Sequence, residues 1–407
     1  MGPEKDNWWV YMLRCQDGTL YTGATCDIPR RLAAHNSGKG AKYTRGRRPV
    51  ELVYTQACGT HSQALRREAA VKKLTRPQKW ELVREQAGLR YELAPMEGIT
   101  GLVFRQMHHR YFGGVDRYFT PFLSPGQNGT FNKKELAQVR PEDNQGMEVV
   151  PQLLTRRAED FIWAARELEQ MGYRQVNLNL GCPSGTVTAK GKGAGFLADP
   201  EGLDRFLDQI FGALEIPISI KTRLGMDSPE EFPRLLDIFQ QYPVAELILH
   251  PRVRADFYRH PVRMEAFAQA AARCTLPLSY NGNLITAQDC HRLASQYPQV
   301  QALMIGRGLI ANPALARQAK GGPPASRQEL RLFHDGLYEG YSQAFRSRKN
   351  AICRMKDVWR CLLCLFEGTE KQAKQLRKAV EPADYEAQVA AIFRDLPLRE
   401  QTVPDWC

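Results

Sequence analysis

Short β-rich runs alternate with amphipathic helical stretches through the chain beyond residue 90. The segment 158–171 shows the helical pattern, because its apolar residues recur on one face. Eight such βα units predict an α/β fold, a (β/α)8 or TIM barrel, whose active site lies at the carboxyl ends of the strands. The eight runs are Tyr91–Met96, Asp116–Phe122, Glu148–Leu154, Gln175–Gly181, Pro217–Gly225, Glu246–Arg252, Pro277–Asn283 and Ala302–Gly308.

The pattern changes on both sides of the predicted barrel. A helical stretch over residues 76–85 ends near Gln86-Ala-Gly-Leu-Arg90, and a new strand follows. Residues 326–400 have a helical pattern throughout. We therefore predict three domains: a small α+β domain over residues 1–88, the barrel over residues 89–322, and a helical domain over residues 323–407.

Composition indicates a soluble globular protein. Of 407 residues, 43% are hydrophobic and 25% are charged. No apolar run approaches the roughly 18 residues of a membrane span, and the first residues lack the apolar core of a signal peptide. We expect a cytoplasmic, monomeric protein without membrane contact, whose ten cysteines are thiols.

Cys361 and Cys364 form a CxxC pair, but their apolar helical setting favours buried helix cysteines over a metal site.

The net charge of +12 is concentrated near the N-terminus. Residues 1–90 contain 17 Lys and Arg against 8 Asp and Glu, which leaves 39 against 36 for the rest of the chain. A small, strongly basic unit suggests a polyanionic partner such as nucleic acid, although a merely soluble basic surface would give the same count.

Polar and glycine residues collect at the predicted strand ends. Gly282, Gly306 and Gly308 allow the close backbone approach that a phosphate needs, and Arg307 adds a positive charge. Gln152, Lys221 and His250 offer hydrogen-bond donors to a polar ring system at the same rim. The pattern favours a phosphorylated cofactor over tight turns alone, and a cation beside a flavin would favour its reduced, anionic form.

From about residue 91 onward the chain resembles the tRNA-dihydrouridine synthases. The resemblance rests on Ala94-Pro-Met-Glu-Gly98, Asn179-Leu-Gly-Cys-Pro-Ser184, Lys221-Thr-Arg-Leu-Gly225, His250-Pro-Arg252, Asn281-Gly282 and Ile305-Gly-Arg-Gly308, in the family's order and spacing. It implies FMN as cofactor, NADPH or NADH as reductant and tRNA as partner. Thr155, Pro251 and Asn283 depart from residues common in the family. The implied cofactor residues are Pro95, Met96, Glu97, Gln152, Lys221, His250, Asn281, Gly282, Asn283, Gly306 and Arg307.

The resemblance also assigns roles in the reaction. Reduction of the uracil C5–C6 bond needs a hydride at C6 from reduced flavin and a proton at C5 from an acid. Cys182 would be that acid and must stay a protonated thiol; a nucleophilic role at C6 is disfavoured because the hydride arrives there. Asn179 would contact the uracil, Tyr258 would face the RNA, and Arg354 and Lys356 match a basic tRNA-binding motif. The alternatives are another FMN barrel, such as a dihydroorotate dehydrogenase-like enzyme, and a non-catalytic tRNA-binding protein.

Residues 8–85 resemble GIY-YIG nuclease domains of the small, free-standing type. Trp9-Val-Tyr11 and Tyr21-Thr-Gly23 match the two signature tripeptides, with a hairpin turn at Asp17-Gly18 between them. The resemblance implies that Tyr11, Tyr21 and His35 handle an attacking water, that Arg31 stabilises the phosphate and that Glu68 binds Mg²⁺. Ala24 stands where some branches carry Lys, so cleavage and binding of nucleic acid without cleavage both remain open.

Overall fold

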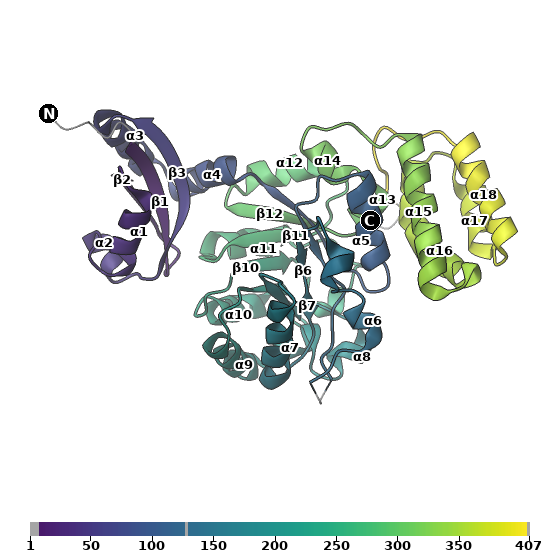
Figure 1. The fold of residues 1–407 in the computed structure, drawn as a ribbon, viewed down its shortest axis with the longest axis horizontal. Helices are drawn as coiled ribbons and strands as arrows, with labels where there is room; N and C mark the ends of the chain where they lie inside the picture. The colour runs from purple at the N-terminus through teal and green to yellow at the C-terminus, as the bar shows by residue number, and fades with distance from the viewer. Residues whose placement is uncertain (1–7, 127–128, 405–407) are drawn as a thin grey trace. The chain divides into compact units, whose positions relative to one another are not determined.

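The computed structural model describes residues 8–126 and 129–404 (Figure 1). They belong to two compact units. The first runs to Leu89 and includes the short segments Ala271–Leu278 and Ala294–Gln301, whereas the second contains Arg90–Ala270, Ser279–Leu293 and the chain from Ala302 onward. The barrel rim and the C-terminal helices therefore share the second unit.

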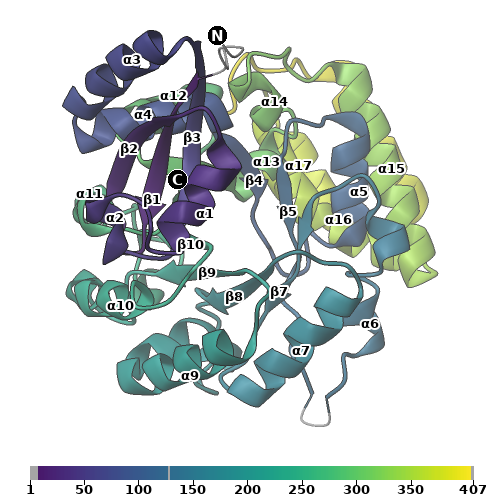
Figure 2. The same cartoon turned by 60° about the vertical axis from the view of Figure 1, so that its left-hand side comes forward.

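The first unit is built on a three-stranded antiparallel sheet of order β2-β1-β3, which Figure 2 shows with its strands side by side. Alternate residues of β1 enter different cores: Val10 and Met12 pack on one face and Tyr11 on the other. The hairpin turn predicted at Asp17-Gly18 is present, with Gly18 at φ 70° and the Asp17 carboxylate accepting from the Thr19 backbone N–H. The elements are β1 (Trp8–Cys15), β2 (Leu20–Thr25), α1 (Ile28–Asn36), α2 (Lys42–Arg45), β3 (Val50–Gly59), α3 (His61–Lys73) and α4 (Arg76–Ala87).

The second unit contains a parallel sheet that curls into a barrel, and each of the eight predicted runs contributes to it. The third run is split at Pro151, because proline has no backbone N–H to donate to a neighbouring strand. It therefore forms two short strands: β6 pairs with β5, and β7 pairs with β8. The fold-class prediction is confirmed. The strands are β4 (Arg90–Leu93), β5 (Arg117–Phe119), β6 (Val149–Val150), β7 (Gln152–Leu153), β8 (Val176–Leu180), β9 (Ile218–Arg223), β10 (Glu246–His250), β11 (Leu278–Asn281) and β12 (Val300–Ile305).

Helices and short helical turns connect these strands. Helix α7 is the segment that the sequence pattern predicts, and Phe161, Ala165 and Leu168 are buried on its inner face. The α-helices are α5 (Leu102–Tyr111), α6 (Lys133–Leu136), α7 (Ala158–Gln170), α8 (Gly185–Thr188), α9 (Pro200–Ala213), α10 (Phe232–Phe239), α11 (Met264–Arg273), α12 (Ala287–Gln296), α13 (Arg307–Ala311) and α14 (Leu315–Ala319). The 3-10 turns are η1 (Pro141–Asn144), η2 (Gly193–Ala198), η3 (Pro229–Glu231) and η4 (Arg254–Asp256).

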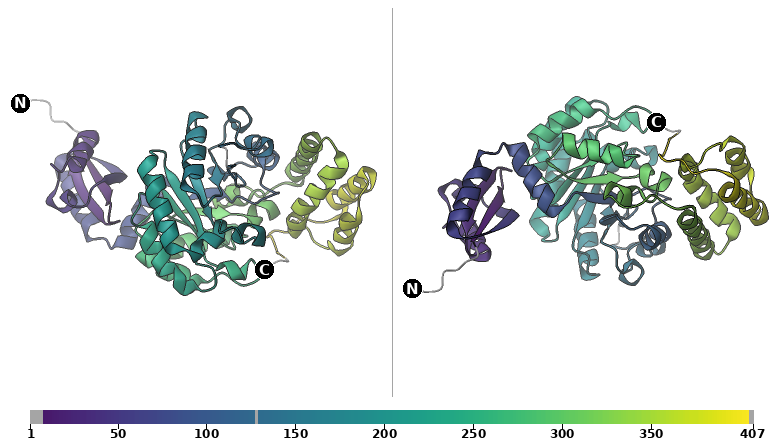
Figure 3. Two further views of the ribbon diagram at one scale, coloured as in Figure 1. Left: turned by 90° about the horizontal axis from the view of Figure 1, so that it is seen from below. Right: turned by 90° about the horizontal axis from the view of Figure 1, so that it is seen from above.

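The C-terminal part is helical, and both views of Figure 3 show its helices gathered into one group. The buried Tyr385 hydroxyl joins three of them, because it lies 2.7 Å from His334 Nε2 and accepts from Trp359 Nε1 at 2.9 Å. Helix α15 packs on α5, and α16 packs on α13, which brings α16 to the barrel rim. Within the described residues, no helix is long and apolar enough to cross a membrane. The elements are α15 (Arg327–Phe345), α16 (Arg348–Leu362), η5 (Leu363–Leu365), α17 (Glu370–Lys378) and α18 (Pro382–Asp395).

Candidate active sites

A cavity of about 490 Å³ opens at the carboxyl ends of the barrel strands. Cys182, Asn179 and Tyr258 line it together with every residue that the sequence predicts for the cofactor. The only predicted residues of this site that do not line it are Arg354 and Lys356. The predicted cofactor residues in its wall are Pro95, Met96, Glu97, Gln152, Lys221, His250, Asn281, Gly282, Asn283, Gly306 and Arg307.

At the ends of β11 and β12, the wall of the cavity is packed so closely that its glycines leave little or no room for a side chain. A Cβ atom at Gly308 would lie 2.0 Å from the Leu284 carbonyl oxygen, and one at Gly306 would lie 3.3 Å from Met96 Sδ. A side chain is excluded at Gly308 and crowded at Gly306. The half-buried backbone at Gly306, with Arg307 beside it, suits a phosphate group.

Burial sets the protonation of the basic groups in the cavity. Burial lowers the pKa of Lys221 to about 7, with a smaller contribution from the charge of Arg223. Burial also holds the pKa of His250 well below its usual value, so this imidazole is neutral. Its Nδ1 lies 3.3 Å from Asn281 Oδ1, while Arg252 Nη1 lies 3.2 Å from its Nε2. His250 therefore carries its hydrogen on Nδ1 and accepts from Arg252 at Nε2.

The backbone turn at Cys182 is held by Asn179. Its Oδ1 accepts from the backbone N–H groups of Gly181 and Cys182, each at 3.0 Å, and its Nδ2 donates to Gln152 Oε1 at 2.7 Å. Gln152 Nε2 in turn donates to Asn177 Oδ1 at 2.7 Å. The amide predicted to contact the uracil thus also positions the predicted acid.

The Cys182 thiol is kept protonated. Burial is the largest influence and raises its pKa, while a Ser184 backbone hydrogen bond and the charges of Arg223 and Lys221 act in the opposite direction more weakly. This is the state that a proton donor needs at neutral pH.

Helix α16 closes part of the cavity through Asp357, Arg360 and Cys361, none of which was predicted as a residue of this site. Arg354 lies one turn earlier, with Nη1 3.6 Å from Asp357 Oδ2. Lys356 Nζ donates to the Arg377 carbonyl oxygen at 3.0 Å, at the end of α17. The three-residue spacing of Asp357 and Arg360 places them on one face of a helix, and this could be seen in the sequence. That this face reaches the barrel rim follows only from the packing of α16 on α13.

In the first unit, four predicted residues form one cluster. Arg31 Nε donates to the Tyr11 hydroxyl oxygen at 3.0 Å, and that hydroxyl lies 2.9 Å from His35 Nε2. The Tyr21 ring centre is 5.0 Å from that of His35. Thr44 also belongs to this cluster and was not predicted from the sequence. Its hydroxyl donates to a backbone carbonyl oxygen and lies 2.7 Å from His35 Nδ1, so the hydroxyl oxygen accepts a hydrogen bond from that nitrogen. His35 Nε2 is therefore the acceptor for the Tyr11 hydroxyl.

Burial controls the pKa values in this cluster. It raises the pKa of Tyr11 to about 12, although the Arg31 hydrogen bond acts against it. It lowers the pKa of His35 to about 4, with a further contribution from Arg31. Gly23 and Gly40 make the packing possible, since Cβ atoms there would lie 2.6 Å from the Tyr11 hydroxyl and from His35 Nδ1, respectively. At neutral pH the cluster holds a neutral tyrosine and a neutral histidine.

The predicted metal ligand stands apart from other acids. Glu68 Oε1 lies 2.6 Å from Lys72 Nζ, one helical turn away. Its charge contributes to the raised pKa of Tyr11 and so reaches the cluster. Among the described residues, no group of three or more His, Cys, Asp or Glu side chains is arranged to hold a metal ion, and this includes the buried Cys361 and Cys364.

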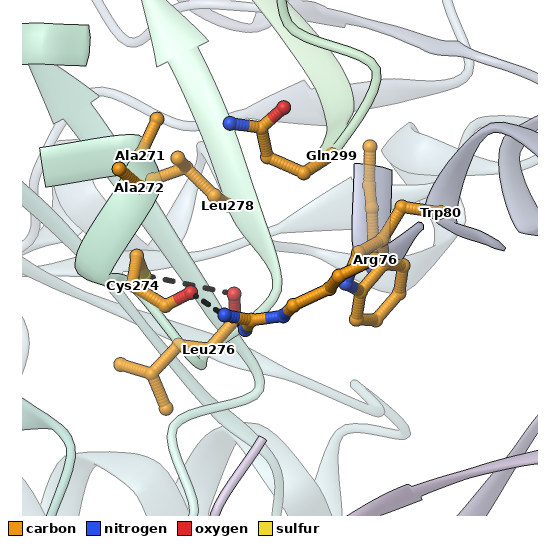
Figure 4. Close-up of a pocket in the computed structure, with 9 residues that line it drawn as sticks. Arg76, Trp80, Ala271, Ala272, Cys274, Leu276, Leu278 and Gln299 are labelled. Carbon is orange, nitrogen blue, oxygen red and sulfur yellow. Dashed lines mark hydrogen bonds between the residues drawn. The ribbon is translucent and has the colours of Figure 1, made fainter. Parts of the chain in front are cut away.

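A second cavity of about 80 Å³ lies in the first unit (Figure 4). Arg76 Nη2 donates to the Cys274 carbonyl oxygen at 3.3 Å, and Cys274 Sγ donates to the Leu276 carbonyl at 3.7 Å. Burial raises the pKa of Cys274 to about 11. Its lining brings no acid, base and nucleophile together.

Comparisons with known proteins agree with both resemblances. The dihydrouridine synthase family model matches residues 92–396, and the GIY-YIG catalytic domain matches residues 7–81. "Probable tRNA-dihydrouridine synthase 2" of Bacillus subtilis is 30% identical over 62% of this chain and 79% of its own length. "tRNA-dihydrouridine(16) synthase" of Pseudomonas putida is 28% identical over 67% and 87%. A Staphylococcus epidermidis protein named UPF0213 is 51% identical over 20% of this chain and 98% of its own length. The chain therefore belongs to the dihydrouridine synthase family and carries a GIY-YIG domain in addition.

Proposed function

We propose that this chain reduces uridines in tRNA to 5,6-dihydrouridine, with FMN as cofactor, NADPH or NADH as reductant and Cys182 as the proton donor. The observation that carries the proposal is a thiol that burial keeps protonated, in the wall of a cavity whose glycine-lined side suits a phosphate. The related proteins named tRNA-dihydrouridine synthases support the substrate. We further propose a cytoplasmic monomer.

The residues present fit FMN. Gly282, Gly306 and Arg307 would hold its phosphate, while Lys221 and the neutral His250 would face its polar ring edge. When bound and reduced, FMN would supply the hydride that this reduction needs. The remaining predicted contacts are Pro95, Met96, Glu97, Gln152, Asn281 and Asn283.

The chain's own groups supply the proton and the position. Cys182 S–H donates its proton to C5 as the hydride adds at C6. Asn179 holds the turn that carries the thiol, through its bonds to the backbone N–H groups of Gly181 and Cys182. A uridine must leave its stack to reach this cavity, which costs a few kcal/mol. Tyr258, Arg354 and Lys356 would offset that cost by contacting the RNA.

The test uses the purified full chain with NADPH and unmodified tRNA transcripts, and maps dihydrouridine. Cys182→Ala should lower the rate roughly 10²–10⁴-fold, the usual contribution of a general acid. Cys26→Ala removes an exposed thiol outside the cavity and serves as the matched control. An unchanged rate in Cys182→Ala would exclude the thiol as the acid.

A second function is favoured by the cluster in the first unit: Mg²⁺-dependent cleavage of a phosphodiester. Tyr11 would orient the attacking water. As the water loses a proton to the Tyr11 hydroxyl oxygen, that hydroxyl would give its own proton to His35 Nε2, which already faces it. Tyr21 would help to position that water. Arg31 would stabilise the phosphate charge. One carboxylate with water ligands suits Mg²⁺, so Glu68 fits, provided that the metal displaces Lys72.

Cleavage is tested on RNA and DNA substrates with and without Mg²⁺, with wild type compared with Glu68→Gln. Glu51→Gln is the control, because Glu51 is also paired with a cation, at 2.5 Å from Arg14. Loss of cleavage in Glu68→Gln alone supports the nuclease. Equal cleavage in all three proteins would exclude Glu68 as the metal ligand and show that the cleavage does not depend on the proposed metal site. No cleavage by wild type would leave binding of nucleic acid as the function of this domain.

A further inference from the structure

The loop after β10 holds an aromatic residue in a strained conformation. Phe257 has φ 47° and ψ −105°, outside the regions open to side chains with a Cβ. Among the described residues, the only other non-glycine residue with positive φ is Arg346, which has an ordinary left-handed conformation at the end of α15. Phe257 is also 38% exposed, although it is large and apolar. A buried packing role therefore does not account for the strain.

Charged groups lock this backbone in place. Arg223 Nη1 donates to the carbonyl oxygens of Phe257 at 3.0 Å and Val253 at 3.1 Å. Asp256 Oδ2 accepts from the Val253 backbone N–H at 3.0 Å, and both Asp256 oxygens accept from Arg263. Strained residues persist where their surroundings over-determine them, and such places cluster at functional sites.

Phe257 and Tyr258 are consecutive exposed aromatic residues, and the second of them lines the cavity. The Arg254 guanidinium lies 5.6 Å from the Phe257 ring centre, and those of Arg223 and Arg307 lie 5.2 and 5.5 Å from that of Tyr258. Tyr258 is 52% exposed and lines the cavity. The Phe257 ring thus lies against one guanidinium and the Tyr258 ring against two, and both side chains remain partly exposed.

The charge around the pair suits a polyanion. The segment 250–263 contains four arginines and one acid, Asp256, whose carboxylate is already paired with Arg263. Arg259 is exposed next to Tyr258. Exposed aromatic rings interleaved with arginines are the means by which proteins hold unstacked bases and the adjoining phosphates.

We propose that Phe257 stacks on the base next to the target uridine and takes the place in the stack that the turned-out uridine leaves. The inference rests on the proposed tRNA reduction and adds a specific RNA contact to it. The strain has a direct consequence: it fixes the ring in an exposed position that a relaxed loop would not require. The stack offsets part of the cost of turning the uridine out.

The test is Phe257→Gly, because glycine adopts φ 47° without strain. The variant should unfold at the same or a higher temperature than wild type, yet its KM and Kd for tRNA transcripts should rise roughly 5- to 100-fold, as expected for the loss of one base–aromatic stack. Phe257→Trp should restore both constants, whereas Phe257→Leu should not. Arg259→Gln should instead lower the dependence of Kd on salt, which Phe257→Gly should leave unchanged.

The outcomes separate this inference from the proposed function. Unchanged KM and Kd in Phe257→Gly would overturn the inference, while the reduction of tRNA by wild type would stand. A fall in unfolding temperature with kcat lost and Kd unchanged would also overturn it, because the role would then be structural. If wild type binds tRNA through Phe257 but forms no dihydrouridine, the contact stands and the proposed reaction fails.

Discussion

The substitution Asn179→Ala separates two roles for one side chain. In the structure, Asn179 holds the turn at Cys182 with two backbone hydrogen bonds and donates a third to Gln152. If these bonds matter, removing the amide should both destabilise the protein and misplace the thiol. If Asn179 acts only on the uracil, the free protein should be unaffected.

The expected loss in the free energy of unfolding follows from the polar groups that the substitution leaves without a partner. Gln152 is fully buried, so its Oε1 would lose a partner where water cannot easily replace it, at a cost of about 1–3 kcal/mol. Gly181 and Cys182 are only half-buried, so water can reach their N–H groups and each lost bond costs about 0.5–1 kcal/mol. The free energy of unfolding should therefore fall by about 2–5 kcal/mol. A displacement of the thiol by about 1 Å should lower kcat on the order of 100-fold.

The assay combines urea unfolding of the full chain with kcat for dihydrouridine formation. Asn312→Ala is the matched control, because Asn312 has the same 7% exposure, accepts from one backbone N–H and donates to Gln318 Oε1. Its loss should lower stability by a similar amount and leave kcat within about twofold, since it does not line the cavity. Wild-type stability in Asn179→Ala, with only KM changed, would refute the role in holding the turn.

Three further predictions test other parts of the two sites. Because burial raises the pKa of Cys182 and the protonated thiol is the active form, the fall in kcat that follows ionisation of the thiol should begin at a higher pH than an ordinary cysteine would give; a second fall at or below the ordinary cysteine pKa, beyond the step expected from Lys221 near pH 7, would contradict this. Gly308→Ala places a Cβ 2.0 Å from a backbone carbonyl oxygen, so FMN content and melting temperature should drop, whereas Gly212→Ala, with no atom within 4 Å, should change neither. Thr44→Val removes the acceptor of His35 Nδ1–H and should lower Mg²⁺-dependent cleavage about 10- to 100-fold, with rescue by Thr44→Ser; equal cleavage in both variants would show that the His35 orientation does not matter.

The barrel could be predicted because its evidence is local. Each strand is a short apolar run between helical segments, and all eight runs overlap a strand of the barrel. The division of the third run into β6 and β7 could not be predicted from the sequence, where its only sign is the proline at residue 151. Whether a proline interrupts a strand depends on whether a neighbouring strand would otherwise accept a hydrogen bond from that position. The boundaries of the three domains remain predictions.

The cavity wall was predicted where motifs supply it and missed where packing supplies it. The strand-end motifs located all eleven proposed cofactor residues, because a parallel barrel brings its strand ends to one rim. Asp357 and Arg360 escaped prediction, because their place depends on how α16 packs on α13. Thr44 escaped for the same reason: its partner His35 lies nine residues away on another helix, and the bond exists only after both helices have packed.

The state of Cys182 follows from a competition that the sequence does not reveal. Arg223 and Lys221 are both near enough to lower the pKa of the thiol, and a basic surrounding is the usual way in which proteins activate a cysteine as a thiolate. Burial outweighs them here. The same burial lowers the pKa of Lys221 to about 7, so one of the two cations is itself only partly charged. Arg223 is also occupied, because its guanidinium donates to three backbone carbonyl oxygens. The cations are thus weakened or engaged elsewhere, which explains how a protonated thiol can persist beside groups that would favour a thiolate.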